Sequence, residues 1–151
     1  MNDRSARAWI WASILLQCVG YVYDAVWHGW LNPGLEPQTT EAMARHLGSV
    51  HLPLYFGALS VFVATFTVLV DQARRSSAGI ALPIAFAGAV VSAGAEAWHA
   101  ASHMRLDTHS APIAGILSVV GFFVVVVATY CWGRSSARRD AAAASERHRA
   151  A

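Results

Sequence analysis

The sequence predicts an all-α protein, an integral membrane four-helix bundle with both termini in the cytoplasm and two parallel helix-hairpin repeats. Three observations lead to this fold class. Hydrophobic residues make up 56% of the chain and charged residues 13%, whereas a soluble domain carries about a quarter charged residues. The apolar residues gather in four long runs, and most arginines lie on one side of them. Polar residues on the other side follow a pattern that occurs twice.

Each apolar run is close to the ~20 residues that a helix needs to cross a hydrocarbon core about 30 Å thick. The first run is too long and too aromatic at both ends for a cleaved signal peptide, so we expect it to remain in the protein. A single domain, residues 1–134, holds all four runs, and residues 135–151 are expected to form a flexible cytoplasmic tail. The four predicted spans are residues 8–30, 52–71, 79–102 and 111–133.

The connection between the first two spans predicts a cover over one end of the bundle. The turn-forming segment Asn32-Pro33-Gly34 ends the first span. Thr39 or Thr40 then caps a short helix that ends near Gly48. We expect this short helix to lie along the membrane surface.

The arginines predict the orientation of the bundle. The chain has no lysine, and nine of its eleven arginines lie before the first span, between the second and third, or after the fourth. The opposite side has only Arg45 and Arg105. Because cytoplasmic loops carry the excess of positive charge, both termini are predicted in the cytoplasm, in a multi-pass protein of the cell (inner) membrane. The basic collar suits anionic lipid headgroups of the bilayer and does not indicate a nucleic-acid partner.

Acidic and histidine residues repeat at the predicted extracytoplasmic ends of the spans. The segment Asp24–His28 closes the first span and Glu96–His99 the third, and His51 or His109 then opens the span that follows. This parallel duplication predicts an axis along the membrane normal, with the two polar sets facing each other.

Helical spacing places the members of each set on one face. Asp24 and His28 are four residues apart, and Glu96 is three and seven residues from His99 and His103. Ionisable groups at this depth normally face the bundle interior and have a partner there. Histidines at matching depth are the expected partners.

Two imidazoles and one carboxylate form the smallest set for a non-haem iron site with open positions, and they also suit zinc with a bound water. The sequence therefore predicts two transition-metal ions, of iron, copper or zinc. Each half of the chain would supply one set of ligands. Tyr21 and Tyr55 are the candidate catalytic residues, as proton or electron relays beside the metals. The candidate ligands are Asp24, His28, His46, His51, Glu96, His99, His103 and His109.

Two short resemblances accompany these candidates. The HxxxxH pair His46 and His51 and the HxxxH pair His99 and His103 resemble the histidine boxes of membrane fatty-acid desaturases and hydroxylases, which implies a two-metal centre. This chain lacks the HH pair of those boxes and has prominent carboxylates instead. The segment Asp24–His28 resembles the DxxxH copper-binding helix of particulate methane monooxygenases, which implies copper. Each resemblance covers only a few residues.

The residues favour a metal-dependent membrane oxidoreductase of the oxygenase or hydroxylase type, acting on a lipophilic or small substrate, since an open His and carboxylate site suits dioxygen. A copper or zinc binding and delivery protein is one alternative, and Met104 beside His103 favours copper in it. A b-type haem protein with two histidine ligands, or an accessory subunit of a membrane complex, is another. Haem leaves Asp24 and Glu96 unexplained. The sequence is also compatible with a redox partner, with a homo-oligomer and with a place in a larger membrane complex.

Overall fold

The computed structural model describes residues 2–75, 79–107 and 109–150, and within these ranges the chain is helical and contains no strand. Four stretches are long and apolar enough to cross a membrane, which confirms the predicted helical class: Asp3–Leu31, Thr40–Arg74, Ala81–Met104 and Ser110–Arg138. The elements are α1 (Asp3–Val26), η1 (Trp27–Leu31), α2 (Thr40–His46), η2 (Leu47–His51), α3 (Leu52–Arg74), α4 (Ala81–Met104) and α5 (Ser110–Ala150).

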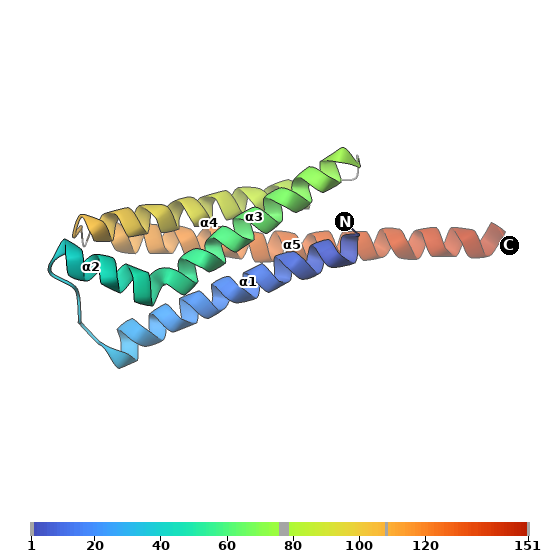
Figure 1. Cartoon of the computed structure of the whole chain (residues 1–151). Helices are drawn as coiled ribbons and strands as arrows, with labels where there is room; N and C mark the ends of the chain where they lie inside the picture. Colours follow the sequence, from blue (N-terminus) through green and yellow to red (C-terminus); the bar gives the residue numbers. More distant parts are fainter. Residues whose placement is uncertain (1, 76–78, 108, 151) are drawn as a thin grey trace.

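The long helices run side by side along one axis (Figure 1). The chain begins at the end of the bundle where α3 passes to α4, and α5 extends beyond that end to its C-terminus. Contacts are densest between α4 and α5 and between α1 and α3, with α3 and α4 joining the two pairs. The bundle therefore consists of two antiparallel pairs packed through α3 and α4.

Small residues bring the helices of each pair close together. A Cβ atom on Gly20 of α1 would lie 2.5 Å from the Leu54 Cα of α3, and one on Gly121 of α5 would lie 2.6 Å from the Ser92 backbone nitrogen of α4. Neither position can accept a side chain without moving a backbone. Without a strong hydrophobic force between helices in lipid, such close backbone approach supplies much of the association energy.

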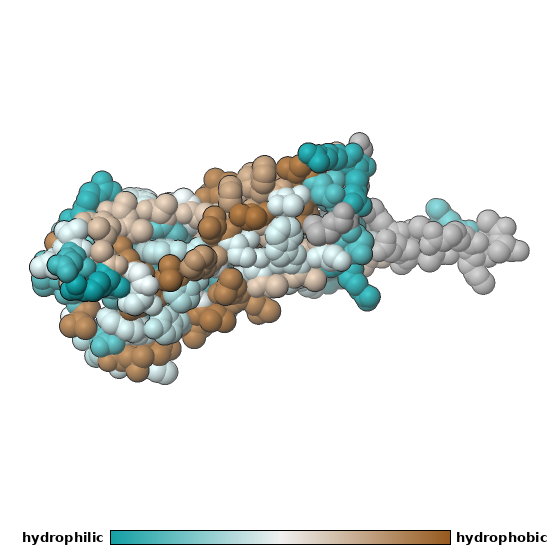
Figure 2. All heavy atoms as spheres, in the orientation of Figure 1, coloured by the Kyte–Doolittle hydropathy of each residue, from teal (hydrophilic) through white to brown (hydrophobic). Residues whose placement is uncertain are grey.

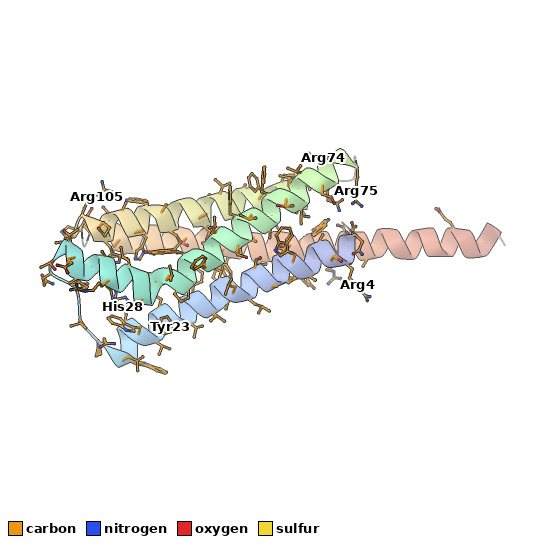
Figure 3. All side chains as sticks on the ribbon, in the orientation of Figure 1. Arg4, Tyr23, His28, Arg74, Arg75 and Arg105 are labelled. Atoms are coloured by element: carbon orange, nitrogen blue, oxygen red, sulfur yellow. The ribbon has the colours of Figure 1, made fainter. Side chains whose placement is uncertain are left out.

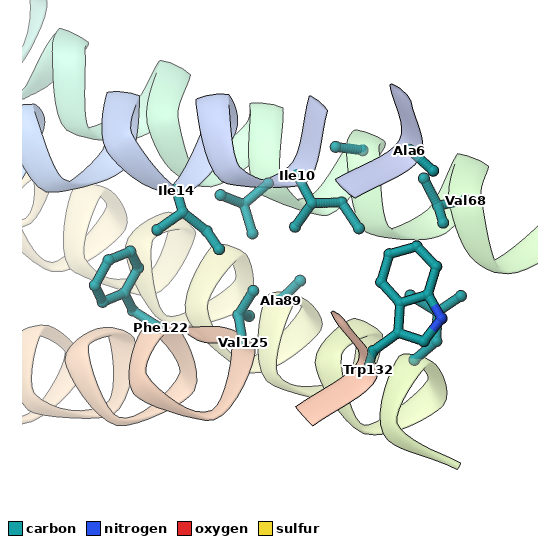
Figure 4. Packing of buried hydrophobic residues seen from close by; sticks show 11 residues of the cluster. Ala6, Ile10, Ile14, Val68, Ala89, Phe122, Val125 and Trp132 are labelled. Atoms are coloured by element: carbon teal, nitrogen blue, oxygen red, sulfur yellow. The ribbon is translucent and has the colours of Figure 1, made fainter. Parts of the chain in front are cut away.

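The apolar core fills the half of the bundle nearest the chain termini (Figure 4). Ile10 and Ile14 of α1 meet Phe122 and Val125 of α5 there, and Trp132 closes the end of the cluster. Trp132 is only 1% exposed. Its ring is buried in the core, where Arg7 approaches it at 6.0 Å from the ring centroid.

Large apolar side chains also cover the outside of the bundle. The space-filling view shows a hydrophobic middle with hydrophilic residues at both ends of the four-helix part (Figure 2). Leu15, Val19, Phe56 and Phe123 are each more than half exposed. Soluble proteins rarely expose apolar patches on this scale, whereas membrane-spanning helices are expected to.

The predicted surface helix is not a separate element. The Thr39 hydroxyl does cap α2, accepting a hydrogen bond of 3.2 Å from the Ala42 amide. No break follows at Gly48, because α2 continues through the π-helical turn η2 into α3 as one helix, Thr40–Arg74. A second π-helical turn, η1, ends the first span. Such turns occur frequently at functional sites.

At the other end of the sequence, α5 runs as helix through Ala150, so the residues beyond the fourth predicted span are helical. The flexibility of this tail stays a prediction.

Candidate metal centre

Five imidazoles converge at the end of the bundle away from the chain termini. They come from three parts of the chain: His28 in η1, His46 and His51 at the ends of α2 and η2, and His99 and His103 near the end of α4. Ligand atoms of His28, His46 and His51 lie within 4.8 Å of one another, as do those of His51, His99 and His103. His51 belongs to both groups and is the centre of the cluster.

The ring distances confirm the central place of His51. Its ring centroid lies 4.9 Å from that of His46, 5.4 Å from His28, and 5.3 Å from both His99 and His103. His51 is 1% exposed and His46 is 7% exposed. Both π-helical turns contribute here, because they carry His28 and His51.

Distances between donor atoms match those expected around one metal ion. The Nε2 atoms of His46 and His51 are 3.2 Å apart. On the other side of the His51 ring, Nδ1 lies 2.9 Å from Oδ1 of Asp24. Two donors bound to one ion at about 2.0–2.1 Å lie about 3 Å apart. Each nitrogen of His51 is therefore paired with a second donor at a ligand-like separation.

Both ring nitrogens of His99 are buried and have no hydrogen-bond partner among the described residues. Nδ1 of His51 and Oδ1 of Asp24 are also buried, and each has the other as its partner at 2.9 Å. Buried polar atoms that lack partners cost about 1–3 kcal/mol each. Metal coordination would give such an atom a partner, so these residues fit a bound cation.

A cavity of about 220 Å³ gives access to the cluster from the end of the bundle. His99 and His103 form part of its wall, together with Met43 of α2 and residues of the loop before α2 and of the α4–α5 turn. Met43 is 4% exposed, so its thioether is a buried, soft donor in the wall of the same cavity as His99 and His103. The cavity has room for water or a small molecule.

Aromatic rings enclose the histidines. Trp27 packs against His28 and His46, with ring centroids 4.9 and 4.6 Å away. The ring of Tyr55 stacks on His51 at 5.9 Å, with an angle of 18° between the planes. Tyr55 is thus in contact with the cluster, and its role as a relay stays a prediction. Tyr21, the other predicted relay, lies in a separate polar network.

That network is a group of buried polar side chains which the sequence interpretation missed. Gln17 is fully buried and donates hydrogen bonds to Ser92 Oγ at 2.8 Å and to the Tyr21 hydroxyl at 3.1 Å. The Tyr21 hydroxyl is 2.6 Å from Ser118 Oγ. The four-residue spacing between Gln17 and Tyr21 in an apolar run was the available signal. The other members of the network, Ser92 and Ser118, are on α4 and α5, and sequence spacing cannot reveal them.

Glu96 and His109, two of the predicted ligands, are not members of the two three-histidine groups of the described chain, and neither is Asp24. Glu96 is 3% exposed, and His109 is exposed in the turn before α5. His46 and His103 meet His51 instead. The expected division into two equivalent sets, one per half of the chain, is thus not the arrangement seen.

The turn that holds His109 is organised by Asp107. Its Oδ1 accepts hydrogen bonds from the backbone amides of His109 at 3.0 Å and Ser110 at 3.1 Å. Side-chain and backbone hydrogen bonds from Ser110, and then the amide of His109, lower the pKa of the Asp107 carboxyl. Asp107 therefore acts as the cap of α5.

Comparison with known proteins finds no family model, no curated protein and no solved structure that matches this chain.

Proposed function

We propose that this protein is an integral membrane metalloprotein that binds transition-metal ions in the five-histidine cluster and acts as an oxidoreductase of the oxygenase or hydroxylase type. The observation that carries the proposal is the convergence of five imidazoles on His51 together with buried donor atoms that lack partners within the described chain. Imidazole and carboxylate donors suit iron, copper and zinc. Only iron and copper among these support redox chemistry.

Two ions would each occupy one of the two donor groups that share His51, one with His28 and His46 and the other with His99 and His103. Asp24, 2.9 Å from Nδ1 of His51, would be a carboxylate ligand in this arrangement. In the one-ion arrangement, Asp24 would instead orient the His51 ring, as carboxylates commonly orient metal-bound histidines. The metal content per chain separates the two arrangements.

The surroundings of the cluster support a reaction more than simple storage. The cavity beside His99 and His103 would admit a small oxidant such as dioxygen. A redox metal with open positions supplies the activation of that oxidant. Tyr55, stacked on His51, is placed to pass a proton or an electron to the centre.

We propose that the cluster faces the extracytoplasmic side of the cell membrane. Arg4, Arg74 and Arg75 lie at one end of the bundle, and His28 and Arg105 lie at the other (Figure 3). The positive-inside rule puts the end with more arginines in the cytoplasm. The bilayer would then surround the apolar middle of the bundle.

A copper-binding and delivery protein is the second candidate. The buried Met43 in the wall of the same cavity favours it, because thioethers select Cu(I). A haem bound between two of these histidines fits less well. Neighbouring imidazoles are 4.5–5.4 Å apart between centroids, closer than two axial imidazoles on opposite faces of a haem.

Elemental analysis of the detergent-purified protein tests the proposal. We expect about two metal ions per chain. When the iron or copper form is supplied with a reductant and a lipophilic or small substrate, we also expect oxygen consumption and a hydroxylated product. His109→Ala is the matched control, because His109 lies outside both donor groups of the described chain, and it should keep the metal. The proposal is overturned if the wild type holds no more metal than a variant lacking His28, His46 and His103. Metal transfer to an acceptor without oxygen consumption would support the delivery role instead.

A further inference from the structure

We propose that a slot between α3 and α4 binds the hydroxyl end of a lipophilic phenol or alcohol; this inference rests on the proposed function and names its substrate class. The slot has a volume of about 290 Å³. Tyr55, Ala58 and Leu59 of α3 line one side, and Glu96 with three alanines of α4 lines the other.

Two residues of the slot, Tyr55 and Glu96, each carry a buried polar atom beside the apolar wall. The Tyr55 hydroxyl and Oε2 of Glu96 are both buried, and neither atom has a hydrogen-bond partner among the described residues. The Glu96 carboxyl also accepts a hydrogen bond from Ser118. Glu96 is 3% exposed. A buried acid on a membrane-spanning helix is costly and marks a functional position by default. These two atoms therefore indicate a ligand with one polar group.

A single hydroxyl group on the ligand would give both atoms a hydrogen-bond partner. The ligand oxygen would accept a hydrogen bond from the Tyr55 hydroxyl, and the ligand hydroxyl would donate one to the Glu96 carboxylate. The hydrocarbon part would contact the alanines and Leu59. A lipid acyl chain could fill the same walls, but it would leave both polar atoms without a partner.

The position of the slot suits a lipophilic substrate of the metal centre. Its mouth lies on the outside of the bundle, because Leu59 is 55% exposed and Ala97 is also exposed. A ligand could therefore enter from the bilayer. Its inner end reaches Tyr55, whose ring stacks on His51, and Glu96 lies one helical turn from His99. The bound hydroxyl would sit beside the histidine cluster.

Competitive photolabelling tests the slot. An alkylphenol that carries a diazirine is crosslinked to the purified full-length protein, and para-pentylphenol or para-pentylanisole competes with it. The anisole lacks the hydroxyl hydrogen, so we expect it to compete at least about tenfold more weakly. Labelled peptides should contain the slot residues of α3 or α4.

Variants assign the binding to the two polar atoms. Tyr55→Phe and Glu96→Gln should each weaken phenol binding about tenfold. The anisole oxygen accepts but does not donate, so Glu96→Gln should leave anisole binding unchanged, whereas Tyr55→Phe should weaken it. Tyr23→Phe is the matched control, since Tyr23 lies on the exposed surface of α1, and it should bind as the wild type does. Ala97→Leu, which fills the slot and removes no polar atom, should abolish labelling there. It also gives a second test if a polar variant fails to fold.

Equal competition by phenol and anisole in the wild type would overturn the slot proposal and indicate an acyl-chain groove. His103→Ala separates the two proposals, because it alters the metal cluster and leaves the slot residues in place. Metal binding without phenol selectivity refutes only the slot. Phenol selectivity without metal binding refutes the proposed oxidoreductase and keeps the slot as a binding site.

Discussion

Replacing His51 by leucine removes the one imidazole common to both donor groups. Leucine is apolar and close to histidine in size, so the buried position stays filled. Asp24 would keep His28 as a neighbour, because Oδ1 of Asp24 lies 3.7 Å from Nε2 of His28. The substitution therefore tests metal binding more than folding.

The expected magnitude follows from the number of donors left. Without His51, each three-histidine group keeps only two imidazoles, whereas His28→Leu leaves the group of His51, His99 and His103 complete. Changing a residue that only orients a ligand weakens metal affinity about 10–100-fold. Removing a shared ligand should exceed this range, so we expect a loss of at least about 100-fold for His51→Leu and a smaller loss for His28→Leu.

The assay is competition with a chelator of known affinity, followed by elemental analysis of the protein fraction. Circular dichroism and the elution volume in detergent show whether each variant keeps its helices and size. If a folded His51→Leu variant retained the metal content and affinity of the wild type, the placement of His51 at the centre of the site would be refuted.

Three further predictions follow from particular contacts. Asp24→Asn should weaken metal binding at least about tenfold, measured by the same chelator competition, because it removes the charge beside His51. Gly57→Ala should lower the unfolding temperature in detergent, since its Cβ would overlap the backbone of Gln17, whereas Gly29→Ala, with open space around it, should not. The pKa of Asp107 is lower in the folded protein than in the unfolded chain. The ionised carboxyl therefore stabilises the folded protein fully above the unfolded pKa of about 3.9, and this stabilisation is lost as the pH falls through the folded pKa. Between pH 2 and 6, the unfolding temperature of Asp107→Asn should therefore depend less on pH than that of the wild type. An unchanged profile would contradict the capping role.

The sequence alone predicted the helical class and the four apolar spans, because hydrophobic runs of this length have few other stable structures. It also identified the histidines of the cluster, since ionisable residues at one depth of apolar helices need partners. Helical spacing correctly placed Asp24 and His28 on one face, where their side chains are 3.7 Å apart.

Only the tertiary structure decided which of these residues meet. The continuous helix from Thr40 to Arg74 carries His46 and His51 into the bundle end, where a separate surface helix was expected. His109 lies in an exposed turn, and the buried Gln17 forms a network with residues far away in the sequence. Sequence periodicity defines the face of each helix, but the rotation and close approach of packed helices determine which faces share a site.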